Sequence, residues 1–144
     1  MKQIFGLYGT SNVGKSETIK NVYRKLTEKY PNFIFQKDFK QIIADEGDIC
    51  VIIIINGKII GIESQGDPNS RIFISLPIFV KFNCDIILCA TRTRGATVEE
   101  VEKLKSAYEL KWINKNPSEN ATKNKSDNDK LATEILNLII DKIN

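Results

Sequence analysis

The chain has 144 residues, of which 42% are hydrophobic and 27% are charged, and its formal net charge is +3. This length and composition predict a single globular domain, and they exclude a disordered chain or a helical membrane protein. The small charge does not favour nucleic-acid binding, and the lack of histidine excludes imidazole-based catalytic triads, metal sites and proton shuttles within one chain.

The first third of the chain predicts a strand, a glycine-containing loop and a helix. Residues 3–8 are a short apolar run, and residues 15–30 carry apolar side chains every three or four positions until Pro31 interrupts the pattern. Residues 33–35 predict a second, short strand, and residues 36–47 predict a polar connection of uncertain structure.

The middle of the chain predicts a hairpin, a helix and a buried strand. Residues 48–55 and 58–63 are β-branched runs joined by an Asn-Gly dipeptide, which favours a two-residue type I′ turn. Residues 69–82 have helical spacing but contain Pro77, so a kinked helix is expected. The apolar run 84–90 is typical of a parallel strand that helices cover on both faces.

The last third of the chain predicts two helices separated by a polar segment. Thr97 and Glu100 form a capping-box pattern for a helix that extends to about residue 114. Residues 116–130 are almost wholly polar and predict a mobile loop or a lid. Residues 131–143 have one apolar face and predict a C-terminal amphipathic helix.

Together these elements predict an α/β fold. We expect a three-layer α/β/α sandwich whose mainly parallel sheet has about five strands, one of them antiparallel in the hairpin. The strand ending at Tyr8 is expected at the centre, between the strands that end at Glu63 and Ala90.

One motif carries the chemistry. Residues 9–16 read G-x-x-x-x-G-K-S and lie between a predicted strand and a predicted helix. The two glycines allow a tight turn that points backbone N–H groups inward, and the start of the helix adds partial positive charge, so the loop suits phosphate oxygens. The residues expected to bind a nucleotide are Gly9, Asn12, Val13, Gly14, Lys15, Ser16, Glu17 and Thr18.

This loop resembles the Walker A motif of the P-loop NTPase superfamily. The resemblance implies one P-loop nucleotide-binding domain over residues 1–144, with a nucleoside triphosphate and Mg²⁺ as ligands. It further implies that Lys15 spans the β- and γ-phosphates, that Ser16 offers its hydroxyl to Mg²⁺, and that Thr18 lines the phosphate or base side. An ordinary glycine turn is the alternative interpretation.

A P-loop also needs a carboxylate at the end of a neighbouring strand to hold the magnesium. Glu63 ends the strand 58–63 and resembles a Walker B acid, with Glu where the family usually has Asp. The segment from Glu63 to Gly66 resembles the E-x-x-G form of a GTPase switch loop. Asp67 is the competing carboxylate, as a metal contact or as the base that orients water. A solvated turn with helix capping at Asp67 is the alternative.

Three further charged residues are candidates for the site. Arg92 and Arg94 follow a predicted parallel strand at the sheet edge where α/β proteins bind ligands, and a guanidinium there can stabilise a transferring phosphoryl group. Surface solubility is the alternative for both. Asp38 follows the second predicted strand, where P-loop kinases often keep a substrate-binding or base carboxylate, although a solvated loop is also open.

The sequence lacks the motif with which GTPases select guanine as the nucleotide base. GTPases select guanine with Asn-Lys-x-Asp after a late strand, whereas here Asn114, Lys115 and Asn116 are followed by Pro117 at the end of a predicted helix. We therefore expect ATP rather than GTP. The function expected is ATP hydrolysis or γ-phosphate transfer with Mg²⁺. The alternatives are a GTPase-like switch or a nucleotide-binding regulatory module with negligible turnover.

The cysteines bear on the cellular compartment. Cys50, Cys84 and Cys89 form no C-x-x-C pair and lie in or beside apolar runs, so we expect buried, reduced thiols in a cytoplasmic protein and no zinc. The most apolar stretch, 50–62, is shorter than the roughly 20 residues of a membrane-spanning helix, and no membrane partner is expected. The sequence identifies no protein partner and no phosphoryl acceptor.

Overall fold

The computed structural model describes residues 2–44, 46–67 and 71–144, which form an α/β fold around one six-stranded sheet. The strands are β1 (Gln3–Tyr8), β2 (Ile34–Phe35), β3 (Cys50–Ile55), β4 (Lys58–Glu63), β5 (Ile86–Thr91) and β6 (Glu109–Asn114). The helices in the described residues are α1 (Lys15–Lys29), α2 (Ile72–Lys81), α3 (Ala96–Glu102) and α4 (Ala121–Ile143).

The sheet is mixed, with the strand order β2-β3-β4-β5-β1-β6. β4, β5, β1 and β6 run parallel to one another, whereas β2 pairs with β3 and β3 with β4 in antiparallel fashion. The expected strand order was wrong, because β1 lies between β5 and β6 rather than beside β4. The loops that follow the four parallel strands therefore meet at one edge of the sheet.

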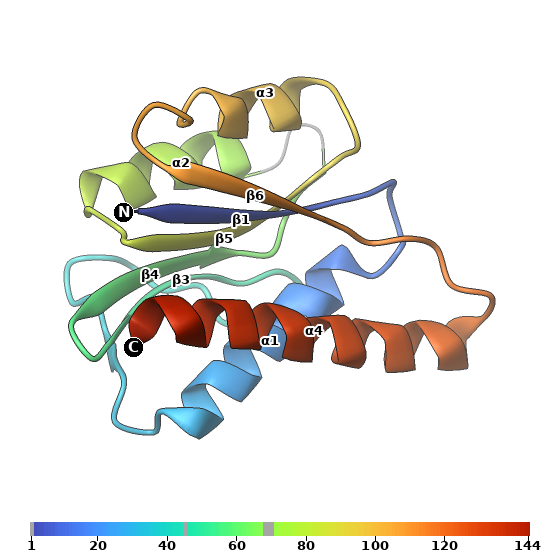
Figure 1. Ribbon diagram of the computed structural model, residues 1–144, viewed down its shortest axis with the longest axis horizontal. Helices are drawn as coiled ribbons and strands as arrows, with labels where there is room; N and C mark the ends of the chain where they lie inside the picture. The colour runs from blue at the N-terminus through green and yellow to red at the C-terminus, as the bar shows by residue number, and fades with distance from the viewer. Residues whose placement is uncertain (1, 45, 68–70) are drawn as a thin grey trace.

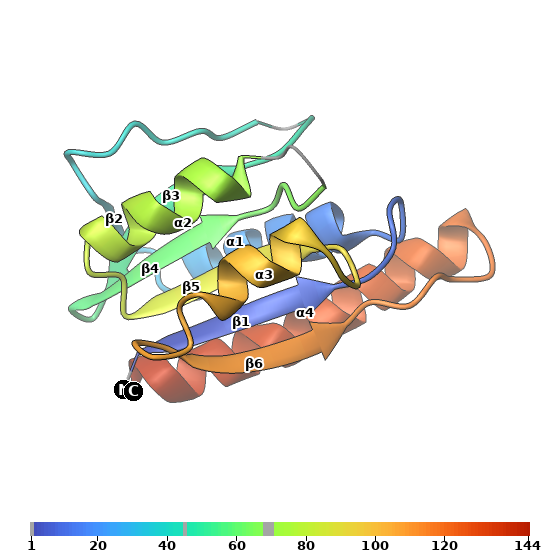
Figure 2. The ribbon, with the colours of Figure 1, turned by 90° about the horizontal axis from the view of Figure 1, so that it is seen from above.

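Two helices cover each face of the sheet. In Figures 1 and 2, α1 and α4 lie on one side of the sheet and α2 and α3 on the other. Alternating side chains of each strand supply the two apolar layers: Phe5 and Leu7 pack with α1 and α4, while Ile4 packs with α2 and α3.

The hairpin between β3 and β4 confirms the predicted turn. Asn56 and Gly57 both have left-handed backbone angles, with φ of 50° and 80°, as a type I′ turn requires. The ladder runs from Cys50 opposite Glu63 to Ile55 opposite Lys58. The helix expected over 69–82 is α2, which starts at Ile72 and contains Pro77; positions 69 and 70 lie outside the described residues.

The helix expected from Thr97 to residue 114 was wrong beyond Glu102. After α3, tight turns follow in which Leu104 N–H donates to the carbonyl of Val101, and the chain then enters β6. Here sheet pairing overrides helical spacing. β6 pairs with β1 in parallel register along its full length, and the Trp112 ring covers Gly6, where a Cβ atom would lie 2.6 Å from the ring.

The predicted capping box is also absent from α3. Gly95 is the N-cap residue, and the hydroxyl of Thr97 instead accepts a hydrogen bond from the backbone N–H of Arg92 at 3.0 Å. Thr97 thus ties α3 to the loop after β5.

The polar segment 116–130 is not a loop over most of its length. α4 begins at Ala121, where the side chain of Asn120 accepts a hydrogen bond from the N–H of Lys123. This N-cap starts the helix ten residues before the first apolar position of the expected helix, Leu131. The amphipathic pattern marked only the part of α4 that packs on the sheet.

The cysteines are confirmed as buried free thiols. Burial raises the pKa of Cys50, Cys84 and Cys89 to about 12, which keeps them protonated at neutral pH. Within the ranges that the structure describes, no helix has both the length and the apolar composition needed to cross a bilayer.

Replacing Ile135 by alanine should test the packing of α4 on the sheet. Ile135 is fully buried in the α1–α4 layer, so Ile135→Ala should lower the free energy of unfolding by about 2–5 kcal/mol in urea denaturation. Glu134 is exposed on the same turn, and Glu134→Ala should change it by less than about 0.5 kcal/mol. Equal effects of the two variants would contradict this packing.

Candidate functional site

The loop between β1 and α1 has the backbone geometry that its glycines allow. Gly14 is the N-cap of α1 with φ of 103°, and Asn12 also has a positive φ, of 60°. At Gly9 a Cβ atom would lie 2.5 Å from the carbonyl oxygen of Lys115. Glycine is therefore required at both ends of the loop, for the turn at Gly14 and for the close contact at Gly9.

The Lys15 side chain connects the first residue of this loop to the end of β5. It is buried, at 6% exposure, and its Nζ donates hydrogen bonds of 2.7 Å to the carbonyl oxygens of Gly9 and Thr91. Burial lowers the pKa of the ammonium to about 8, an effect that the Asp67 carboxylate partly offsets and the Arg92 guanidinium reinforces. The first residue of α1 thus fastens the loop to the end of β5.

A cavity of about 320 Å³ opens at the start of α1. It lies at the edge where β1 and β4 end, so residues far apart in the sequence face one space. Its lining residues are Asn12, Gly14, Lys15, Ser16, Glu17, Asp48, Ser64, Gln65, Gly66, Asp67 and Asn124.

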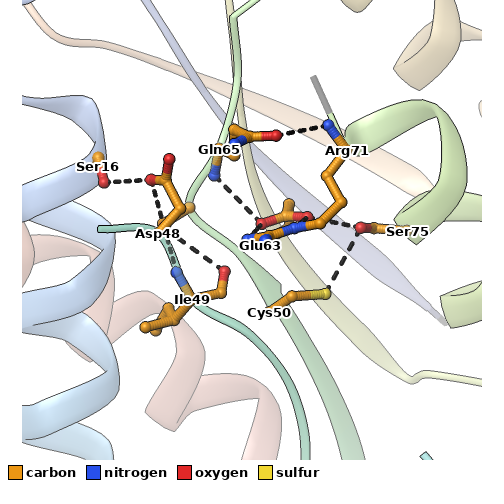
Figure 3. Close-up of polar contacts among 9 residues, drawn as sticks. Ser16, Asp48, Ile49, Cys50, Glu63, Gln65, Arg71 and Ser75 are labelled. Atoms are coloured by element: carbon orange, nitrogen blue, oxygen red, sulfur yellow. Dashed lines mark hydrogen bonds and ion pairs between the residues drawn. The ribbon is translucent and has the colours of Figure 1, made fainter. Parts of the chain in front are cut away.

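Asp48 is the carboxylate that faces Ser16 (Figure 3). The Ser16 hydroxyl donates to Asp48 Oδ1 at 2.5 Å, and the Ser64 hydroxyl donates to the same oxygen at 2.8 Å. Ser64 is itself fixed, because its oxygen accepts the N–H of Ile49 at 2.8 Å. A half-buried carboxylate is thereby held beside a hydroxyl within the cavity.

Sequence reasoning missed Asp48, although a signal was present. The two-residue turn sets the register of the hairpin, and continuing the pairing beyond Cys50 and Glu63 brings residue 48 beside the segment that follows β4. Asp48 and the residues after Glu63 therefore had to share the sheet edge.

The Glu63 side chain points away from Asp48, toward Arg71 and Ser75 (Figure 3). Glu63 does not line the cavity. It is fully buried, accepts two hydrogen bonds of 2.8 Å from the Arg71 guanidinium, and accepts a third of 2.6 Å from the Ser75 hydroxyl. The structure therefore does not bring Glu63 to Ser16, and its carboxylate fastens α2 to the sheet.

Asp67 and Arg92 lie together at the rim of the cavity. Arg92 Nε donates to Asp67 Oδ1 at 3.2 Å, and the Asp67 side chain is 64% exposed. Arg94 and Asp38 are exposed and do not line the cavity. Of the two arginine candidates, the structure brings only Arg92 to a residue of the cavity lining.

The remaining loop residues connect the cavity to α4. Thr18 is buried, and its hydroxyl contacts the carbonyl of Gly14 and Asn128 Oδ1. The Asn128 side chain also packs so tightly on Gly14 that a Cβ atom there would overlap it. Val13 is buried in the loop, whereas Glu17 is exposed at the rim and pairs with Lys20.

The segment 114–116 ends a strand, which corrects the sequence interpretation. We expected it at the end of a helix, but Asn114 ends β6 and Lys115 N–H donates to the carbonyl of Tyr8. The Lys115 ammonium is buried and donates to the Asn116 carbonyl and to Asn124 Oδ1. The segment therefore follows a strand instead of ending a helix, and Pro117 comes directly after it.

Comparison of the chain with protein-family models, with curated proteins and with solved structures gave no match. The interpretation of the cavity accordingly stands on its geometry and chemistry.

The lowered pKa of Lys15 should make stability depend on pH. In the unfolded chain the lysine titrates near 10.5 and in the folded protein near 8, so between these values the unfolded chain binds more protons and stability rises with pH. Lys15→Met lacks this contribution. From pH 7 to pH 10 the free energy of unfolding of the natural protein should rise, relative to that of Lys15→Met, by roughly 1–3 kcal/mol.

Denaturant titrations of both proteins at each pH measure this difference, in which the other titrating groups cancel. A difference that stays flat across this range would show that the ammonium is not buried as the structure has it.

Proposed function

We propose that this protein is a Mg²⁺-dependent P-loop NTPase that binds ATP and either hydrolyses it or transfers its γ-phosphate. The observation that carries the proposal is the placement of Lys15. The Lys15 ammonium is buried at the start of a 15-residue helix and lines a cavity. The residue before it, Gly14, has a left-handed backbone conformation. This combination suits a polyphosphate better than any uncharged ligand.

The phosphate chain would lie against the start of α1. The first intrahelical hydrogen bond of this helix runs from Thr18 N–H to the carbonyl of Gly14, so the N–H groups of Lys15, Ser16 and Glu17 precede it and can donate to an anion. The Lys15 ammonium adds a full charge. Its two bonds to carbonyl oxygens can be exchanged for stronger bonds to phosphate oxygens.

The carboxylates of the cavity support a requirement for magnesium. Glu17, Asp48 and Asp67 all line the space that a polyanion would enter, and their repulsion of phosphate must be offset. Ser16 and Asp48 present hard oxygen atoms to each other, and such atoms are the ligands that Mg²⁺ prefers. Magnesium bound there with the phosphates would neutralise charge on the transferring group.

The groups at the rim suit in-line attack on the γ-phosphorus. In hydrolysis a water oxygen bonds to this phosphorus, the bond to the bridging oxygen breaks, and the diphosphate leaves. Asp67 can accept a hydrogen bond from the attacking water, and Arg92, now paired with Asp67, can stabilise negative charge on the phosphoryl group. In kinase chemistry an acceptor hydroxyl replaces the water.

A GTPase-like switch is the second candidate. It is favoured by the position of the segment 114–116 at the end of β6 and by Gly66, which lines the cavity and where an added Cβ atom would lie 2.4 Å from the Ala90 carbonyl oxygen. It is opposed by Pro117, because guanine recognition in that family needs an acid there. A preference for ATP or for GTP in binding separates the two candidate functions.

Replacing Lys15 by alanine should remove most of the affinity for nucleoside triphosphates. A panel of ATP, GTP and their diphosphates, with and without Mg²⁺, should show thermal stabilisation of the natural protein that is greatest with Mg²⁺ and ATP and absent in Lys15→Ala. Phosphate release measured in the same wells distinguishes hydrolysis from binding alone. Unchanged ATP affinity in Lys15→Ala would overturn the proposal.

Replacing Asp48 by asparagine should weaken the response to magnesium. Asp48→Asn keeps the shape of the side chain but loses a charge beside Ser16, so the gain in ATP affinity on adding Mg²⁺ should fall by about tenfold or more. Asp38→Asn, at an exposed position outside the cavity, should respond to Mg²⁺ like the natural protein.

Glu63→Gln provides the comparison that decides between the two carboxylates. It should lower thermal stability, because it disturbs the buried bonds to Arg71 and Ser75, yet keep the magnesium response. Loss of that response in Glu63→Gln, with Asp48→Asn unaffected, would assign the metal to Glu63 instead.

A further inference from the structure

A second cavity adjoins the cavity at the start of α1, in which the phosphates are proposed to bind. It has a volume of about 230 Å³ and shares Asn12 and Asn124 with the larger one. It lies between the loop after β1 and the segment that leads from β6 into α4. Its lining residues are Asn12, Val13, Pro117, Ser118, Asn120, Ala121 and Asn124.

The two cavities differ in chemistry. The larger one is lined by a lysine and three carboxylates, those of Glu17, Asp48 and Asp67, whereas the smaller one has no ionisable side chain among its lining residues. The smaller one offers the apolar atoms of Val13, Pro117 and Ala121 together with side-chain amides and a hydroxyl. A flat, uncharged heteroaromatic ring suits this lining, and a phosphate does not.

The Asn124 amide has a defined orientation at the junction of the two cavities. Its Oδ1 accepts a hydrogen bond from Lys115 Nζ at 3.2 Å. An ammonium is only a donor, so the atom that faces it must be the amide oxygen. The Nδ2 group, on the other branch of the amide, is left as a donor. A ring nitrogen with a lone pair is the natural partner for such a group.

We propose that the smaller cavity binds the base of the nucleotide and selects adenine through the Asn124 amide. The inference rests on the proposed function, because it assigns the remaining part of the same ligand. A nucleoside triphosphate whose phosphates occupy the larger cavity must place its base nearby, and the shared residues Asn12 and Asn124 join the two spaces.

The preference for adenine follows from the lack of a carboxylate among the lining residues of the smaller cavity. The base-pairing edge of guanine presents two donor groups, at N1 and N2, whereas that of adenine presents one donor group and the acceptor N1. The Asp127 carboxylate accepts a hydrogen bond from the Ser118 hydroxyl at 2.7 Å and pairs with Lys123, and it lines a different recess. The lining of the smaller cavity therefore has no carboxylate that could accept from both guanine donors at once, which disfavours guanine.

Titration calorimetry with Mg²⁺ and three ligands, ATP, GTP and tripolyphosphate, tests the proposal. Tripolyphosphate carries the phosphates without a base. Ala121→Leu narrows the smaller cavity at an exposed helix position and should lower ATP affinity by about tenfold while leaving tripolyphosphate affinity unchanged. The matched control is Thr122→Leu, the adjacent exposed residue outside the cavity lining, which should match the natural protein with all three ligands.

Asn124→Asp tests the reading of the base directly. A carboxylate there keeps the contact with Lys115 but replaces a donor by an acceptor, so the ratio of ATP to GTP affinity should fall by about tenfold or more. Taking this ratio cancels any general effect of the added charge on phosphate binding.

The outcomes separate the two proposals. If the natural protein binds neither tripolyphosphate nor ATP, the proposed function and this inference are both overturned. Tripolyphosphate binding with GTP tighter than ATP, an unchanged ATP affinity in Ala121→Leu, or an unchanged ratio in Asn124→Asp would overturn only the assignment of the base.

Discussion

Two hydrogen bonds from the Lys15 ammonium, to the carbonyl oxygens of Gly9 and Thr91, hold the candidate site together. They join the loop after β1, the start of α1 and the end of β5. Because the lysine is buried, its charge is costly unless anions or carbonyl dipoles surround it, and its lowered pKa reflects that cost. An anion that entered the cavity would relieve this cost. Burial of the Lys15 ammonium would thus destabilise the protein without a ligand and favour the binding of an anion.

The alternation of side chains along β4 divides the polar residues between two roles. Glu63 lies on the α2 side of the sheet, where Arg71 and Ser75 neutralise and bind it, while the next residue, Ser64, lies on the α1 side and orients Asp48 toward Ser16. A shift of one residue in the hairpin register would exchange these roles. The Asn-Gly turn sets that register. It therefore determines which side chains reach the site, although it lies at the opposite end of the hairpin.

Local signals in the sequence predicted the α/β fold, the glycine loop, the hairpin and α1, because each depends on neighbouring residues or on one short motif. The errors arose where distant contacts decide the structure. The segment containing Trp112 has helical spacing, yet pairing with β1 and the space over Gly6 make it a strand. The polar start of α4 is fixed by the cap at Asn120 and by Asn128, which packs on the glycine loop. Glu63 ends the expected strand, but its ion pair with Arg71 could not be predicted without knowing where α2 lies.

We propose that the loop from Asn12 to Ser16 binds a polyphosphate through its backbone N–H groups and Lys15. Backbone amide NMR during a titration with ATP and Mg²⁺ tests this claim most directly, since it reports on each N–H group separately. The amide resonances of Gly14, Lys15 and Ser16 should shift most, and tripolyphosphate should give the same shifts. Resonances of this loop that stay unchanged at millimolar ATP, or shifts confined to another part of the surface, would contradict this claim.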